Sequence, residues 1–405
     1  MERNMSAAPA KELPRWRVWL AIVLLGVGAF TIVTTELAPI GLLSPIALEL
    51  DRSEATVGLT ITLYAWIGAF SALLAAFTLS RLPRKPLLIG LMLGLALSNM
   101  LAMLAGDFDM LLLARVFGAV AHGLFWAVIA ATAAQIAPAR SVGLATSIVF
   151  GGVSAASVLG VPLANFVGQV SSWRIAFGGI GALGLMVALV MVPILPGLPL
   201  QSGQGRTALA GVLRRPDLLG IYAATALAVT GHFAAFTFIE PFLRSVPDVS
   251  AILVAALLFG FGAAGLFANL LAGIFIDRYL KPFLMLALTL LTLALLVMGA
   301  WDDRLGGLGV SIMLVLWGSS VSAIFVGFQT WILRTAGAAA MSASAVYVAI
   351  FNAAIGIGAM VGAWVLSHAG LPTVLMIAGL GGALALFLVA GLGRPALVFV
   401  QEINK

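Results

Sequence analysis

The sequence contains no cysteine, three histidines and few charged residues, and each shortage narrows what the chain can be. Without cysteine there can be no disulfide, thiolate nucleophile or cysteine metal site. His122, His232 and His368 lie far apart and lack the spacing of metal ligands, so we expect neither metal nor cofactor. Only 9% of the 405 residues are charged, whereas about a quarter is usual in soluble domains. An ordinary soluble protein is therefore excluded.

Hydrophobic residues make up 62% of the chain and gather in long runs between short clusters of charge. Runs of this length predict membrane-spanning helices, and the pattern is typical of an all-α polytopic membrane protein. The first run is too long for the core of a signal peptide and should remain as a helix. We expect twelve spans, at 16–42, 55–79, 85–105, 109–136, 141–169, 174–196, 217–242, 250–276, 281–300, 307–334, 340–368 and 372–393.

The spans divide into two sets of six. We expect an N-terminal half at 1–196, a cytoplasmic linker at 197–216 and a C-terminal half at 217–405. Each half carries a related basic turn after its second span, AFTLSRLPRKP at 76–86 and GIFIDRYLKP at 273–282. Repeated halves are typical of transporters that bind their substrate between the halves, near the membrane midplane.

The basic residues predict the orientation of the spans. If the N-terminus is inside, the outer segments hold only Arg52, Arg174, Arg244 and Arg304, and the other basic residues outside the spans are inside. Cytoplasmic loops carry such an excess of Lys and Arg, so we expect both termini in the cytoplasm. The placement of the charge indicates membrane topology, with the lipid bilayer rather than nucleic acid as partner.

Glu36 is the only charged residue in the apolar run from Val18 to Leu43. A carboxylate inside a span is costly and usually faces a cavity or a partner, which favours a protonatable group in a polar pathway. The alternative is a side chain that reaches the outer headgroups. Pro39 and Gly41 should weaken the helix just beyond it.

Several segments resemble motifs of the major facilitator superfamily. GIFIDR, in the second basic turn, resembles the loop motif of this superfamily and includes Asp277 and Arg278. The first basic turn is the other copy and includes Arg81, Arg84 and Lys85, but Ser80 stands where the motif has Asp. SAASVLGVPLANF at 154–166, with Gly160 and Pro162, resembles the antiporter motif of proton-driven exporters. TTELAPIGLL, RVFGAVAHGLFW, VTGHFAAFTFIEPF and IFNAAIGIGAMVG resemble the sugar-efflux group of the drug:proton antiporter branch.

That resemblance implies a pairing of Glu36 with Arg115, because the first and fourth helices line the central cavity in this superfamily. A static structural pair is the alternative. His122 lies seven residues after Arg115 and Trp126 four further on, so the three share one face of a helix. A cation, an imidazole and an indole suit a sugar, which needs hydrogen-bond partners and an aromatic surface. A lone histidine can also serve only helix packing.

In the second half, His232, Phe236 and Glu240 follow one another at four-residue steps. Glu240 precedes a proline and is expected near the outer surface, as a gate residue or an interfacial charge. Gln329 and Asn352 are isolated polar residues in apolar runs. They are interpreted as substrate contacts with His232 and Phe236, with helix packing as the alternative.

We therefore expect a monomeric proton-coupled exporter of small sugars in the bacterial inner membrane, working by alternating access. The resemblance implies arabinose and thiogalactosides as substrates. The alternatives are a multidrug, chloramphenicol-type or nucleoside exporter on the same fold, and a passive facilitator that needs no titrating Glu36. An intramembrane enzyme would need a metal or nucleophile cluster, and the sequence shows none.

Overall fold

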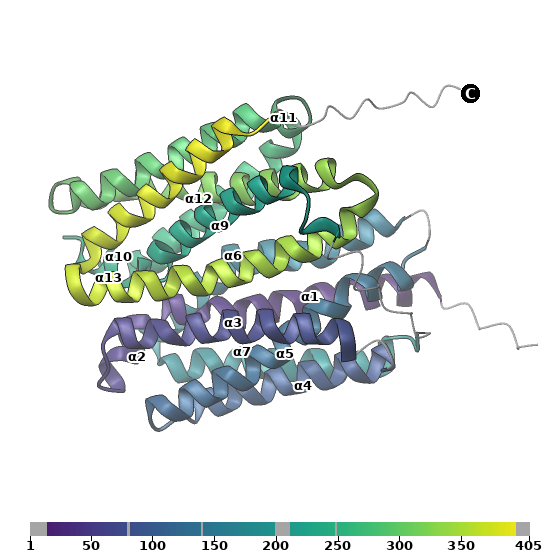
Figure 1. Cartoon of the computed structure of the whole chain (residues 1–405). Coiled ribbons are helices and arrows are strands. Elements are labelled where there is room, and N and C mark those ends of the chain that lie inside the picture. The colour runs from purple at the N-terminus through teal and green to yellow at the C-terminus, as the bar shows by residue number, and fades with distance from the viewer. Residues whose placement is uncertain (1–13, 79–81, 139–140, 199–210, 248, 394–405) are drawn as a thin grey trace, which may run out of the picture.

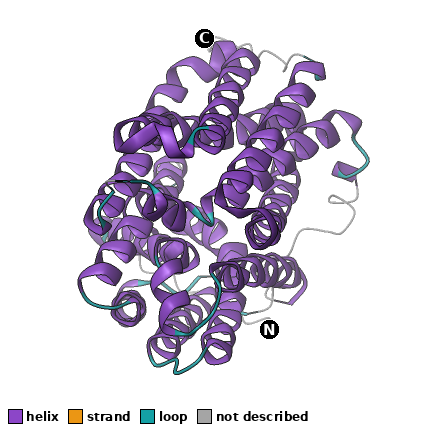
Figure 2. Ribbon diagram, turned by 90° about the vertical axis from the view of Figure 1, so that its left-hand side faces the viewer, coloured by secondary structure: helices purple, strands orange, loops and turns teal. Residues whose placement is uncertain are grey.

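The computed structural model describes residues 14–78, 82–138, 141–198, 211–247 and 249–393, and these contain helices but no strand (Figure 2). The first half comprises α1 (Arg15–Gly41), α2 (Leu43–Glu49), α3 (Glu54–Thr78), α4 (Arg84–Met103), α5 (Phe108–Ile136), α6 (Val142–Val170) and α7 (Trp173–Ile194). The second half comprises α9 (Pro216–Phe236), α10 (Ile239–Ser245), α11 (Ala251–Ala300), α12 (Asp302–Ala336), the short 3-10 turn Gly337–Ala339 and α13 (Ala340–Gly391).

The predicted all-α membrane fold is confirmed. Eleven stretches of the described residues are long and apolar enough to cross a membrane. The last of them, Ser342–Gly391, is 50 residues long, and Gly370 breaks it with a φ of 79°. That left-handed conformation favours glycine, and the break divides α13 into two spans, which brings the count to twelve. A similar break at Tyr279 divides α11.

Two spans are each followed by a short helix near the same end of the protein; the first span has its predicted length, and the seventh is shorter than predicted. The first, expected at 16–42, ends at Gly41 and is followed by the short helix α2. The seventh, expected at 217–242, ends at Phe236 and is followed by α10. Proline explains both breaks because it has no N–H to donate to the carbonyl four residues earlier. Pro45 and Pro241 deprive the carbonyls of Gly41 and Thr237 of their helical donors.

The helices of each half form their own bundle, with α1–α7 on one side and α9–α13 on the other (Figure 1). Within the halves, α1 packs on α6, α4 on α7, α9 on α13 and α11 on α12; between the halves, α3 packs on α13 and α6 on α11. Glycine permits the closest approaches: a Cβ on Gly152 of α6 would collide with the carbonyl of Gly26 in α1, and one on Gly262 of α11 would meet Val158 of α6. Small residues at such crossings let membrane helices approach closely.

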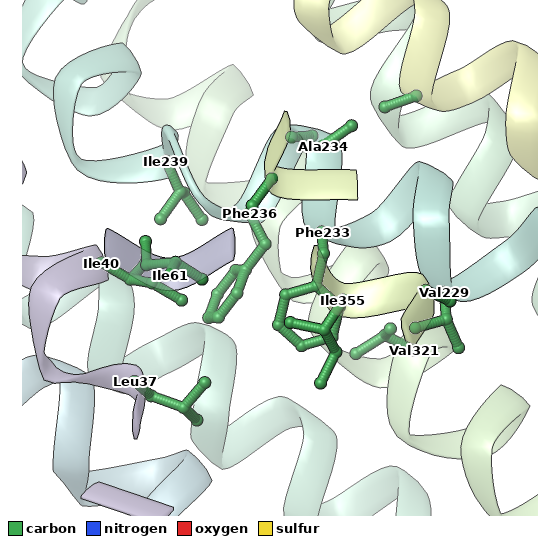
Figure 3. Close-up of a cluster of buried hydrophobic side chains, with 14 of the residues drawn as sticks. Leu37, Ile40, Ile61, Val229, Phe233, Ala234, Phe236, Ile239, Val321 and Ile355 are labelled. Carbon is green, nitrogen blue, oxygen red and sulfur yellow. The ribbon is translucent and has the colours of Figure 1, made fainter. Parts of the chain in front are cut away.

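An apolar cluster joins the two halves at the end of the bundle that carries α2 and α10. Leu37, Ile40 and Ile61 of the first half lie toward Phe236 and Ile239 of the second (Figure 3). Ile40 and Ile239 are fully buried, and Ile61 is 1% exposed. This end lies opposite the end at which α1 begins and α13 ends (Figure 1). The cluster therefore packs the two halves against each other at this end.

Candidate functional site

Glu36 is buried in α1, with 7% of its surface exposed. One carboxylate oxygen, Oε2, lies 3.8 Å from Nε2 of His122 in α5. The other, Oε1, is buried and has no hydrogen-bond partner. Within the described residues, no Lys or Arg nitrogen lies within 4.0 Å of this carboxylate. Glu36 is thus an acid inside a span whose carboxylate faces an imidazole and forms no direct ion pair with a Lys or Arg of the described residues.

Arg115 contacts the backbone of α1 instead of the Glu36 carboxylate. Its guanidinium donates to the carbonyl of Thr35 at 2.6 Å and to the carbonyl of Glu36 at 3.1 Å. Pro39 explains the first bond, because it leaves the Thr35 carbonyl without its helical donor. The guanidinium also lies 4.0 Å from the ring centre of Tyr64. The predicted charge pair is therefore not formed here; Arg115 instead completes the hydrogen bonding of a helix that proline interrupts.

The predicted stripe on α5 does come together, around a residue that the sequence reasoning missed. Tyr64 of α3 lies between Arg115 and His122, with 5.2 Å between the tyrosine and imidazole centres. His122 then meets Trp126 at 6.3 Å, edge to face. Tyr64 is 1% exposed, and its hydroxyl has no partner. The chain has only four tyrosines, so a tyrosine inside a span was the available signal.

The residues of the antiporter motif pack against α1 near Glu36. A Cβ on Gly160 of α6 would lie 3.0 Å from the hydroxyl of Thr34. One turn further along, after Pro162, Asn165 donates to the carbonyl of Gly41 at 2.8 Å. This is the carbonyl that Pro45 leaves without a helical donor. The motif helix thus positions the segment of α1 that carries Glu36.

His232 occupies a separate aromatic cluster in the second half. Its Nδ1 accepts a hydrogen bond from Nε1 of Trp317 at 3.0 Å, and its ring stacks on Phe236 at 4.9 Å. Phe261 stacks on Phe236 in turn, at 5.1 Å. Because the indole N–H can only donate, Nδ1 must be the acceptor, and the neutral imidazole carries its proton on Nε2. Trp317, 85 residues from His232, was not anticipated.

Gln329 and Asn352 are both half-buried but do not meet each other in any described contact. Gln329 of α12 donates to the hydroxyl of Ser344 in α13 at 2.9 Å. Asn352 donates to the carbonyl of Val348 in its own helix at 2.9 Å, which leaves its amide oxygen available. Next to it, Trp66 of α3 crosses between the halves and donates to the carbonyl of Ala353 at 3.2 Å.

The loop-motif residues lie at the end of the bundle near the termini. Arg84 opens α4 and is 9% exposed, and Lys85 follows it half-buried. Arg278 is exposed beside the ring of Tyr279, at the break in α11. Arg81 lies outside the described residues, as does the side chain of Asp277.

Glu240 lies at the opposite end, in α10, and is fully buried. Its Oε2 accepts a hydrogen bond from the backbone N–H of Ser44 in α2 at 2.9 Å. Its Oε1 accepts a hydrogen bond from Arg244, one turn further along α10. Ser44 belongs to the first half and Glu240 to the second, so this carboxylate joins the two halves.

Comparison with known proteins gives a consistent picture. The family model described as Major Facilitator Superfamily matches residues 18–342. Over 377 residues, the chain is 34% identical to a protein of Helicobacter acinonychis (strain Sheeba) named "Probable sugar efflux transporter", covering 93% of this chain and 95% of that one.

Solved structures share the fold at low identity. An inward-facing bacterial homolog of the human lysosomal transporter Spinster is 15% identical, with a TM-score of 0.77, covering 95% of this chain and all of that one. A mutant of the nucleoside transporter NupG is 16% identical, with a TM-score of 0.77 and coverage of 93% and 100%. A D-xylose-proton symporter is 16% identical, with a TM-score of 0.73 and coverage of 94% and 98%.

Proposed function

Because the chain belongs to the major facilitator superfamily, whose members are transporters rather than enzymes, we propose that it is a proton-coupled exporter of small sugars. Sugars and sugar analogues such as arabinose and thiogalactosides are its proposed substrates. The name of the relative that is 34% identical supports sugar efflux. The protein acts as a monomer in the bacterial inner membrane, with both termini in the cytoplasm, as the basic residues predict.

The setting of Glu36 carries the proposal of proton coupling. A buried carboxylate without a cation is costly when charged and is relieved when it takes up a proton. Oε1 has no partner at all, and Oε2 faces only the imidazole of His122 at 3.8 Å. A change of conformation that admits water to this carboxylate changes the cost of its charge. Proton binding and the conformational state are thereby coupled.

Polar and aromatic side chains in both halves are the proposed substrate contacts. His122 and Trp126 in the first half, and His232 and Phe236 in the second, offer imidazole nitrogens and ring faces. A sugar uses both, through its hydroxyls and its C–H surface. Gln329 and Asn352 are proposed to add amide hydrogen bonds.

Transport follows from rocking of the two halves about this central region. Protonation of Glu36 from outside accompanies release of the sugar, and loss of the proton to the cytoplasm restores the empty carrier for the next sugar. Arg115 keeps its hydrogen bonds to α1 throughout, because they go to backbone carbonyls that do not titrate.

Replacing Glu36 with glutamine tests this function. Glu36→Gln keeps the shape and loses the proton, so efflux driven by a pH gradient should stop while substrate exchange continues. Proteoliposomes loaded with a labelled thiogalactoside give both rates, and Glu49→Gln is the matched control because Glu49 lies at the bundle end, paired with Arg174. Full gradient-driven efflux in Glu36→Gln would refute proton coupling through this residue. A counterflow panel of sugars against cationic and neutral drugs separates a sugar exporter from a drug exporter.

A further inference from the structure

At the α2–α10 end, one buried carboxylate accepts hydrogen bonds from both halves of the protein. Glu240 receives the backbone N–H of Ser44 from the first half and the guanidinium of Arg244 from its own helix. The hydroxyl of Ser44 meanwhile donates to Glu54 at the start of α3, at 2.7 Å. Ser44 therefore contacts two carboxylates, one in each half of the protein.

These two contacts of Ser44 differ in what happens when the halves separate. Ser44 and Glu54 both belong to the first half, so their hydrogen bond moves with that half. Arg244 and Glu240 are four residues apart on α10, so their ion pair moves with the second half. The Ser44–Glu240 bond crosses between the halves and must break for this end to open.

The surroundings of Glu240 make this crossing bond costly to leave unmade. The carboxylate is fully buried, and Glu240 directly follows Ile239, a member of the apolar cluster, in α10. Figure 3 shows Ile239 with Leu37, Ile40, Ile61 and Phe236. Gly58 of α3 comes so close to the ring of Phe238 that a Cβ there would lie 2.7 Å from it. A buried charged group is costly unless its hydrogen bonds are made. The backbone N–H of Ser44 supplies one of these bonds. Only a substitution of Ser44 with proline would remove that N–H.

We propose that Glu240 is a latch, which holds the α2–α10 end of the transporter closed by accepting the backbone N–H of Ser44 across the two halves. Opening of that end breaks the Ser44 bond and exposes the apolar cluster. Arg244, one third of whose side chain is exposed, keeps the carboxylate paired in both states. The latch does not depend on whether Glu36 carries the proton or on which substrate is exported.

Labelling of a single introduced thiol tests the latch directly, because the chain has no cysteine of its own. Ile61→Cys places a thiol in the closed apolar cluster, where the native side chain is 1% exposed. Its reaction rate with a maleimide is measured on the full chain in detergent micelles, alone and with Glu240→Ala. The matched control is Glu54→Ala, which removes the other carboxylate that accepts from Ser44 but leaves the crossing bond intact.

Glu240→Ala should speed labelling of the Ile61→Cys thiol about ten-fold, the change in an equilibrium constant expected from one hydrogen bond to a charged group. Glu240→Gln should act in the same direction, because Ser44 and Arg244 donate to different carboxylate oxygens and the amide replaces one of these oxygens with an NH2 group, which can only donate. Glu54→Ala should not speed labelling, because it keeps the N–H bond from Ser44 to Glu240 and frees the Ser44 hydroxyl, which also lies near Glu240. A second reporter, Leu95→Cys, buried inside the first half, should not change in any of these backgrounds.

Three results would overturn the latch. Labelling of the Ile61→Cys thiol could stay unchanged in both Glu240 variants. Glu54→Ala could speed it as much as Glu240→Ala does, which would show a general effect at Ser44. The Leu95→Cys thiol could react faster in parallel, which would show that Glu240 stabilises the fold as a whole.

Discussion

Arg115 should stabilise the protein by donating to the carbonyl of Thr35, which has no helical donor because of Pro39. The effect can be measured as a change in the free energy of unfolding. Arg115→Ala removes donors to the carbonyls of Thr35 and Glu36, at 2.6 and 3.1 Å. A hydrogen bond to a charged group contributes roughly 1.5–3 kcal/mol, and the Arg115 guanidinium donates two such bonds. We expect Arg115→Ala to lower the free energy of unfolding by about 3 kcal/mol.

The cause of that loss can be isolated with a second substitution at Pro39. Pro39→Ala restores a backbone N–H four residues after Thr35, so the carbonyl regains its own helical donor. In the Pro39→Ala background, Arg115→Ala should therefore cost about 1 kcal/mol less than in the native chain, the usual net contribution of one backbone hydrogen bond. The four chains form a double-mutant cycle, measured by chemical unfolding in detergent.

A parallel cycle with Glu36→Ala provides the comparison. The hydrogen bonds of the guanidinium go to backbone carbonyls that Glu36→Ala keeps, so only the longer-range attraction between the two charges can couple Arg115→Ala with Glu36→Ala. This coupling should stay below the roughly 1 kcal/mol expected with Pro39→Ala. The opposite pattern, additivity with Pro39 and strong coupling with Glu36, would refute this account and restore the charge pair expected from the sequence.

Two further predictions follow from packing. Gly152→Ala should lower the free energy of unfolding by about 1–3 kcal/mol, because the added Cβ collides with the carbonyl of Gly26. Gly151→Ala, whose Cβ would meet nothing within 4 Å, should be neutral or stabilising by up to about 1 kcal/mol. Thermal melting of the two variants tests this, and equal losses would contradict it. Trp317→Phe should cost about 1–3 kcal/mol, because the buried Nδ1 of His232 loses its donor; an unchanged melting profile would show that this bond contributes nothing.

The sequence predicts most of the helices because long apolar runs have few alternatives in a membrane. It also predicts the stripe of Arg115, His122 and Trp126, since side chains seven and four residues apart share a helix face. The partners of these residues come from other helices, at separations that no local pattern encodes. Tyr64 is 51 residues from Arg115, and only folding of α3 against α5 brings the two together.

The absence of a direct ion pair between Arg115 and Glu36 has a specific reason. Opposite charges in neighbouring spans suggest an ion pair, yet a guanidinium can equally satisfy backbone carbonyls. The decisive residue was Pro39, which lies four positions after Thr35 and frees its carbonyl. In the same way, Pro241 marked the break between α9 and α10, although the apolar pattern continues through it.

Pro39 in α1 and Pro45 in α2 also affect the order in which the chain can be assembled. The carbonyls of Thr35 and Gly41 obtain their donors from Arg115 and Asn165, which follow 80 and 124 residues later. While the nascent chain is shorter than that, these carbonyls can only be satisfied by water or by other parts of the insertion machinery, because lipid offers no donor. The segment that carries Glu36 therefore reaches its final form only after the fourth and fifth spans have been synthesised and have entered the membrane.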